Sequence, residues 1–127
     1  MVTADALTIS DAAEVTGLST HTLRYYERAG LMLDRVERSP SSHRRYTEAD
    51  IRWVTLLTRL RATGMPIRRI REYADLVRQG DGNEDERLAL LEAHRDAVLE
   101  QLDAMRRNLE AIDYKIGIYE DLCAGSA

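Results

Sequence analysis

Apolar positions at helical spacing, interrupted by glycine, fill the first part of the chain. They predict a short helix over residues 8–16, behind a threonine or serine that can cap it. Gly17 offers the left-handed residue that ends a helix, and Ser19 can cap a second helix that continues to about Arg28. Two helices joined by a short turn with glycine form a helix-turn-helix.

The helical period disappears over residues 31–46, where a Pro-Ser-Ser turn separates two short segments that can pair. This pattern predicts a β-hairpin, or wing. A start that resembles a capping box at Thr47 opens a third helix, which Gly64 closes, and Pro66 at the first helical position opens a fourth. We therefore expect residues 1–78 to form one compact winged helix-turn-helix domain.

The last third of the chain has a different period. After a Gly-rich linker at residues 79–83, apolar residues recur in alternating steps of three and four over residues 84–122, with one charged exception at Arg95. This is the heptad pattern of a coiled coil. A helix of that length spans ~58 Å, too long for the first domain to cover, so we expect two copies to pair and residues 123–127 to form a tail. The predicted dimerisation residues are Leu88, Leu91, Val98, Leu102, Met105, Leu109, Ile112, Ile116 and Tyr119.

The composition is that of a soluble protein, with 44% hydrophobic and 31% charged residues. Long apolar runs and a secretory signal are both absent from the sequence, so we expect a cytoplasmic protein without a membrane span. The single cysteine, Cys123, excludes an internal disulfide framework and a thiolate-rich metal site. We find no phosphate-binding loop, no histidine pair at ligand spacing and no nucleophile motif. The sequence therefore predicts no enzyme, no cofactor and no metal.

A net charge of −4 argues against a nucleic-acid partner until the charge is divided along the chain. Residues 1–80 have 13 Arg against 10 Asp and Glu, whereas residues 81–127 have 5 basic against 12 acidic residues. Within residues 24–71 the net charge is +7, which is the electrostatic footprint of a phosphate-binding surface. The second helix places Arg24 on a polar face that can enter a major groove. For His21 and Arg28 taken singly, an ordinary solvated helix face is the simpler interpretation.

Several motifs in continuous order resemble the MerR family of transcription regulators. They are Thr8-Ile9-Ser10-Asp11-Ala12-Ala13, Thr16-Gly17-Leu18-Ser19, Thr22-Leu23-Arg24-Tyr25-Tyr26-Glu27 with Gly30-Leu31, Arg44-Arg45-Tyr46-Thr47-Glu48-Ala49-Asp50, and Leu60-Arg61 with Gly64 and Ile70. The resemblance covers about residues 8–78. It implies a mainly α fold, with a winged helix-turn-helix domain followed by an antiparallel dimerising coiled-coil helix. It also implies a homodimer on a pseudo-palindromic operator in double-stranded promoter DNA, which it kinks and undertwists so that RNA polymerase engages both promoter elements.

The resemblance also assigns the DNA-binding residues. Thr20, His21, Arg24 and Tyr25 match positions that meet the major groove and its flanking phosphates. Arg44 and Arg45 match backbone contacts of the wing, Tyr46 a residue packed at the wing base that can also reach a phosphate, and Arg61 a phosphate contact at the end of the third helix. Ser42-His43 stands where family wings often have Gly-Tyr or Gly-Phe, which leaves the turn geometry and the role of His43 open.

The effector, if there is one, stays unidentified. Metal-sensing and redox relatives use cysteines around the coiled-coil helix, and aldehyde-responsive relatives use a lone cysteine near the third helix; Cys123 matches neither arrangement. We interpret Cys123 as a buried seam residue. Arg95 with its neighbour His94 could bind an anion or report pH, although a register-setting residue is the commoner explanation. We expect no added effector domain after residue 122, and an unknown small-molecule effector stays open.

Two further interpretations stay open beside a sequence-specific regulator. The chain could be a coiled-coil architectural module, similar to excisionase-like proteins, that uses its helix-turn-helix on protein or on unspecific DNA. It could also be a sensor whose switch is the Cys123 thiol.

Overall fold

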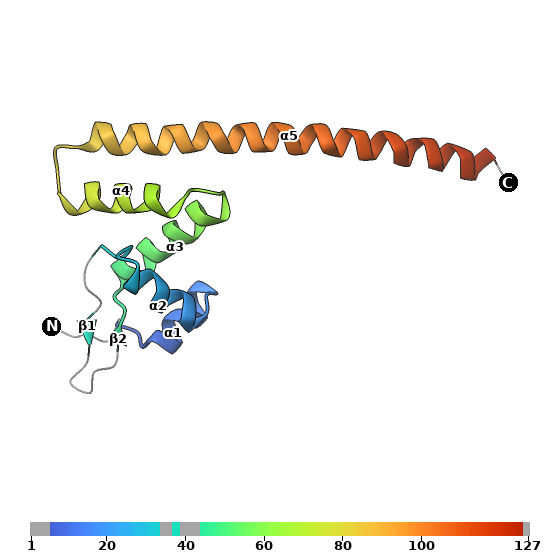
Figure 1. Ribbon diagram of the computed structural model, residues 1–127. Coiled ribbons are helices and arrows are strands. Elements are labelled where there is room, and N and C mark those ends of the chain that lie inside the picture. Colours follow the sequence, from blue (N-terminus) through green and yellow to red (C-terminus); the bar gives the residue numbers. More distant parts are fainter. Residues whose placement is uncertain (1–5, 34–36, 39–43, 126–127) are drawn as a thin grey trace. The chain divides into compact units, whose positions relative to one another are not determined.

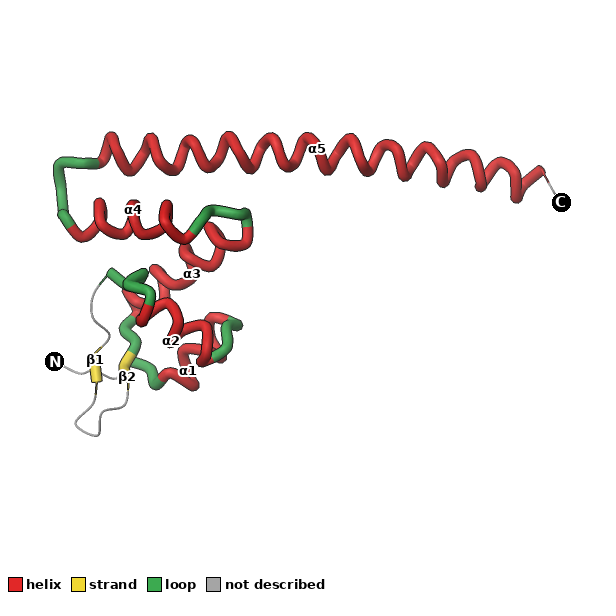
Figure 2. The backbone as a smooth tube through the Cα atoms, viewed as in Figure 1, coloured by secondary structure: helices red, strands yellow, loops and turns green. Residues whose placement is uncertain are grey.

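The computed structural model describes residues 6–33, 37–38 and 44–125, and helices make up most of this part of the chain (Figures 1 and 2). The elements are α1 (Ile9–Thr16), α2 (Thr20–Arg28), β1 (Glu37–Arg38), β2 (Arg44–Arg45), α3 (Glu48–Ala62), α4 (Ile67–Arg78) and α5 (Glu84–Gly125). Contacts divide the chain into two units, residues 1–90 and residues 91–127. Among the described helices, none combines the length and the apolar character that crossing a membrane requires.

The predicted helix-turn-helix is confirmed, and local caps explain where its helices begin and end. The Thr8 hydroxyl accepts a hydrogen bond from the Asp11 N–H at 3.2 Å, and the Ser19 hydroxyl accepts one from the Thr22 N–H at 3.0 Å. Gly17 adopts a left-handed conformation with φ of 75°, which a residue without Cβ reaches at no steric cost. The turn between α1 and α2 is thus built by the residues that the sequence marks for it.

The wing is an antiparallel pair of two-residue strands. β1 and β2 pair with Glu37 opposite Arg45 and Arg38 opposite Arg44. At the base of the wing, Leu7 and Tyr46 exchange two backbone hydrogen bonds of 2.7 Å. The hairpin is therefore confirmed, while its turn, including Ser42 and His43, lies outside the described residues.

α3 begins with a complete capping box. The Thr47 hydroxyl accepts from the Asp50 N–H at 3.1 Å, and the Asp50 carboxylate accepts from the Thr47 N–H at 3.0 Å. The expected start of the fourth helix is wrong by one residue. Pro66 is extended at ψ 148° and forms the cap, so that α4 begins at Ile67.

A single core joins these elements in the first unit. Fully buried residues come from each of the helices α1 to α4 and from the segments between them: Ala12, Leu23, Leu31, Tyr46, Val54, Leu57, Ile70 and Ala74. Leu90, in the first turns of α5, is also buried at 7% exposure. Trp53 on α3 stacks on Tyr73 of α4 with ring centroids 5.6 Å apart.

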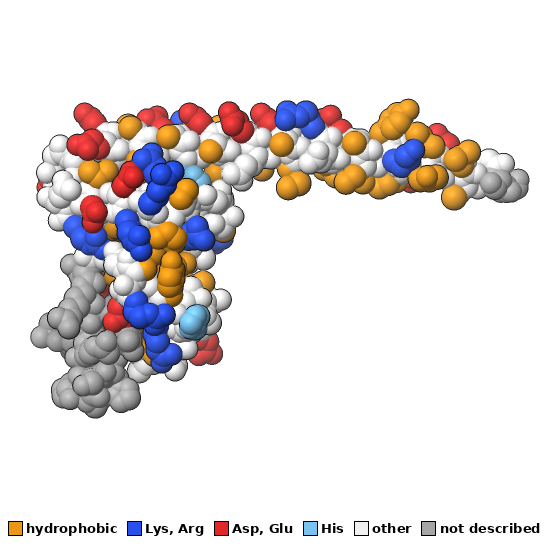
Figure 3. Space-filling view, viewed as in Figure 1, with side chains coloured by type: hydrophobic (Ala, Val, Ile, Leu, Met, Phe, Trp, Pro, Cys, Tyr) orange, Lys and Arg blue, Asp and Glu red, His pale blue; other side chains and the backbone are white. Residues whose placement is uncertain are grey.

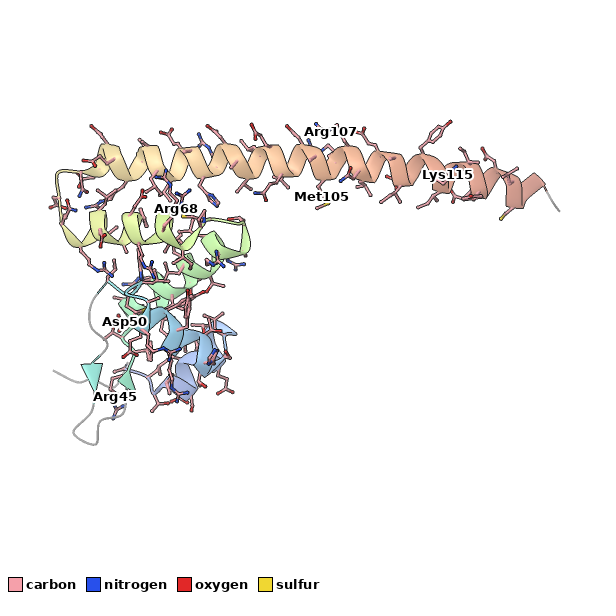
Figure 4. The ribbon with its side chains drawn as sticks, viewed as in Figure 1. Arg45, Asp50, Arg68, Met105, Arg107 and Lys115 are labelled. Atoms are coloured by element: carbon pink, nitrogen blue, oxygen red, sulfur yellow. The ribbon has the colours of Figure 1, made fainter. Side chains whose placement is uncertain are left out.

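α5 is one continuous helix of 42 residues, which corresponds to about 63 Å. Its apolar seam is largely uncovered in the single chain, with Met105 67% and Ile112 57% exposed, and hydrophobic side chains follow its second half in Figure 3. Met105 and Arg107 point to opposite sides of the helix (Figure 4). Cys123, expected to be a buried seam residue, is exposed in the single chain.

Candidate nucleic-acid interface

α2 separates a buried face from a polar, solvent-facing one. Leu23 is fully buried and Tyr26 is 5% exposed, so both anchor the helix to the core. His21 and Arg24 are exposed, and Tyr25 is 40% exposed. Thr20, also assigned to DNA, is half-buried at the start of the helix. Figure 3 shows positively charged side chains over this part of the surface, so the face that could meet DNA is both accessible and basic.

The segment that follows α2 is held by side chains from two other helices. We call residues 29–33 the α2 exit loop. The Trp53 indole N–H donates to the Leu31 carbonyl at 2.7 Å in a buried hydrogen bond. From α4, Arg71 donates to the Ala29 carbonyl at 3.0 Å.

Arg78 of α4 also holds the α2 exit loop. Its guanidinium donates to the carbonyls of Gly30 at 2.6 Å, of Met32, and of Leu33 at 3.2 Å. It also pairs with Asp75 at 2.7 Å. Arg78 therefore ties residues 30–33, just beyond the end of α2, to α4.

Sequence reasoning missed this role of Trp53, Arg71 and Arg78. Arg71 was counted in the basic segment assigned to phosphate binding, and its Nε–H is instead committed to the Ala29 carbonyl. The only sequence signal is the presence of an aromatic N–H donor and of arginines on helices that the pattern already predicts. The partners are more than twenty residues away in the chain.

The wing residues differ in what they offer to DNA. Arg45 on β2 is half-buried and lies on the wing, away from the helical core, in Figure 4. Arg44 is on the same strand, and its side chain lies outside the described part of the structure. Tyr46 is fully buried, so the packing role expected for it is the one it has here. Its reach to a phosphate stays a prediction.

Arg61 and the start of α4 form a second basic region. Arg61 is exposed and donates one hydrogen bond to the Met65 carbonyl at 3.0 Å, which leaves further donors of its guanidinium for another acceptor. The first turn of α4 has no acidic residue and its cap has no side-chain hydrogen bond, so its positive dipole end is not offset there. Arg68, exposed in this turn (Figure 4), adds a charge that sequence reasoning did not assign to the site.

Models of two protein families match the chain. The one described as MerR HTH family regulatory protein matches residues 7–76, and the one described as MerR, DNA binding matches residues 51–114. The chain belongs to the MerR family. A curated MerR-type relative, an uncharacterized HTH-type transcriptional regulator of Haemophilus influenzae, is 37% identical over 113 residues, which cover 89% of this chain and 83% of the relative.

Solved structures of MerR family regulators have the same fold. A putative MerR family transcriptional regulator from Listeria monocytogenes has a TM-score of 0.85 at 33% identity, and the match covers 90% of this chain and 86% of that one. HiNmlR, a MerR family regulator lacking the sensor domain and bound to promoter DNA, has a TM-score of 0.84 at 36% identity, with 91% and 86% covered. This MerR family chain is thus a transcriptional regulator with a DNA-binding domain, in a family of regulators rather than of enzymes.

Within the described residues, no group of three or more histidine, cysteine or acidic side chains is placed to hold a metal ion. Close to the start of α5, backbone N–H groups of Glu84 itself and of Gly82, followed by the Arg87 charge, lower the pKa of the Glu84 carboxyl from its ordinary value.

Proposed function

We propose that this protein is a homodimeric, sequence-specific transcription regulator. It binds a pseudo-palindromic operator in a promoter spacer and distorts the DNA, so that RNA polymerase responds through the DNA rather than through a direct contact. The observation that favours this function most is the exposed basic face of α2, a helix that the buried Leu23 and Tyr26 anchor to the core.

In the proposed complex, α2 enters the major groove with Thr20, His21, Arg24 and Tyr25 toward bases and flanking phosphates. Arg44 and Arg45 of the wing and Arg61 meet the backbone on either side. Arginine suits both tasks because its planar donors pair with guanine or with phosphate oxygens in a bidentate way. The promoter DNA bound to HiNmlR, which has the same fold, supports this assignment by analogy.

The domain assignment follows the same proposal. Residues 1–78 bind DNA, residues 79–83 connect, and residues 84–122 pair with the same helix of a second copy through the exposed seam. Exposed apolar side chains at heptad positions are the usual mark of a helix that pairs. Two DNA-binding domains related by a twofold axis would then match the symmetry of the operator. The dimer would act in the cytoplasm, where the promoter is.

A mobility-shift titration on the DNA upstream of the protein's own gene tests this function. We expect a specific complex at moderate salt and at least about a thousandfold weaker binding to random DNA. The absence of any complex at low salt would exclude DNA binding. Equal affinity for operator and random DNA, without a change in promoter opening, would favour an architectural module instead.

Arg24→Ala tests whether this single side chain contacts a base or a phosphate. If Arg24 reads a guanine, the variant should lose about 1–3 kcal/mol on the operator and discriminate less at one base pair. Arg107→Ala is the matched control, because Arg107 is exposed on α5 and outside the proposed interface. An equal loss on all sequences would show that Arg24 contacts phosphate rather than a base.

A further inference from the structure

The first unit contains a surface hollow of about 340 Å³ that the proposed DNA interface does not use. Helices α3, α4 and the start of α5 contribute to it, as does Leu33 of the α2 exit loop. Small-molecule sites in proteins have volumes of about 300–1,000 Å³ and are mostly apolar with a few polar groups. The hollow is at the lower end of that range, which suits a ligand of one ring and a short chain.

The wall of the hollow is aromatic and held in place. Trp53 and Tyr73 both line it, and their rings are stacked with an angle of 15° between the planes. The indole N–H of Trp53 is already bonded to the Leu31 carbonyl. The faces of the two rings, with Leu33 and Leu56, offer a ligand an apolar surface, and the Tyr73 hydroxyl adds a possible hydrogen-bond partner.

The charged residues that line the hollow are both arginines, Arg52 and Arg87, and none of its lining residues is acidic. Arg87 is held by hydrogen bonds to the Asn83 side-chain oxygen at 2.6 Å and to the Gly80 carbonyl, which are neutral acceptors. Arg52 pairs with Glu48 at 3.1 Å, but both side chains are about 70% exposed, and exposed pairs of this kind contribute little. The Arg87 charge also acts on the nearby Glu84 carboxyl, but both guanidiniums have further N–H groups that can donate to a ligand carboxylate.

We infer that this hollow is a binding site for a small aromatic or branched aliphatic carboxylate. Its apolar part packs on Trp53 and Tyr73, and its carboxylate pairs with Arg87 and Arg52. Charge-assisted pairs of this kind are stronger than neutral hydrogen bonds and select an acid over its neutral analogue.

The site is connected to the helix that would read DNA. Leu33 lines the hollow and belongs to the α2 exit loop, and Trp53 lines the hollow and holds Leu31 of the same loop. A ligand that contacts these two residues changes the energy of the loop and of α2 with it. This regulatory consequence rests on the proposed function, whereas binding of the carboxylate does not.

Trp53 is the only tryptophan of the chain, so its fluorescence reports on the hollow directly. Titration of the full-length protein with 3-phenylpropionate should change this fluorescence saturably, with a Kd below about 1 mM. The neutral 3-phenylpropionamide should bind at least about tenfold more weakly. No saturable change, or equal binding of acid and amide, would overturn the proposal.

Two variants separate the site from unspecific binding. Arg87→Gln should weaken 3-phenylpropionate at least about tenfold, and Ala49→Leu should do the same, because Ala49 lines the hollow and a larger helix-forming residue fills it. Arg107→Gln removes the same charge from an exposed position of α5 and should leave Kd within about twofold. Unchanged binding by Arg87→Gln and Ala49→Leu would overturn the site. A probe that binds only when the chain is kept monomeric would show that a second copy fills the hollow, which also overturns it.

The regulatory consequence is tested by measuring operator affinity with and without the probe. Saturating 3-phenylpropionate should change the operator Kd by about fivefold or more, and this change should disappear in Arg87→Gln. Probe binding without any change in operator affinity would overturn the regulatory role. Intact probe binding by a protein that binds no DNA would instead overturn the proposed function and support the site alone.

Discussion

At the scale of single residues, arginines that look equivalent in sequence have different tasks. Arg24 is exposed on α2, whereas Arg71 and Arg78 donate to backbone carbonyls of the α2 exit loop. Guanidinium groups suit both tasks because they have five donors in a rigid plane. The net charge of a basic segment therefore overstates the charge available to DNA, because it includes the arginines that hold the fold together.

Arg78→Met tests the structural task. The substitution keeps most of the apolar stem but removes the hydrogen bonds to the Gly30, Met32 and Leu33 carbonyls. Water can reach part of this site, since the Arg78 side chain is 32% exposed, so we expect a loss of about 1–3 kcal/mol in the free energy of unfolding. Urea unfolding followed by Trp53 fluorescence measures it.

Arg106→Met is the matched control for this loss. Arg106 has the same spacing to an aspartate, Asp103 at 3.5 Å, but both side chains are more than 60% exposed. None of the described hydrogen bonds joins Arg106 to a backbone carbonyl. It should change stability by less than about 0.5 kcal/mol. Equal effects of the two variants would mean that Arg78 contributes only its ion pair.

At the scale of elements, prediction succeeds where the signal is local. Ser19 and Thr47 cap the helices they were expected to cap, and of the two candidates for the first helix, Thr8 and Ser10, Thr8 is the cap. A cap needs only its own side chain and an N–H three residues on. Pro66 shows the limit of a local rule, because proline fits both the first helical position and the cap. Its extended ψ angle shows that it is the cap. Tyr46, which the resemblance placed at the wing base, is fully buried there and pairs with Leu7, a partner that the local pattern did not indicate.

The apolar seam of α5 can be tested as the dimer interface by substitution. Leu109 is 54% exposed on the seam, and Tyr114 is 73% exposed at the heptad position facing away from it. Leu109→Asp should abolish the proposed dimer, because two buried carboxylates lose their hydration without a partner. Light scattering during size-exclusion chromatography should then report the mass of one chain, 14.5 kDa.

Tyr114→Asp serves as the control for helix propensity and net charge. It introduces the same side chain on the same helix and should leave the dimer mass unchanged. A monomer in both variants would mean that added charge on α5, rather than loss of the seam, disrupts pairing. A dimer in both would mean that the seam is not the interface.

At the scale of the whole molecule, sequence and structure together explain why an acidic protein can bind DNA. Acidic residues dominate residues 81–127, and basic residues dominate residues 1–80. Heptad spacing and local charge can be predicted from the sequence because both depend on residues close together in the chain. The hollow next to Trp53 and the hold of Arg78 on residues 30–33 were not predictable, because they depend on packing between residues far apart in the chain.

The dependence of binding on salt tests this division of charge. Each phosphate contact that is lost should flatten the slope of log K against log salt by about 0.9. Arg45→Ala removes one such contact per copy, so a dimer on its operator should lose close to two units of slope, with the same loss on every sequence. Arg107→Ala removes an equal charge from α5 and should leave the slope unchanged, because the proposed function assigns Arg107 no phosphate contact and only such contacts release counterions. Equal flattening by both variants would mean that net charge governs binding, and the basic wing would then have no separate role.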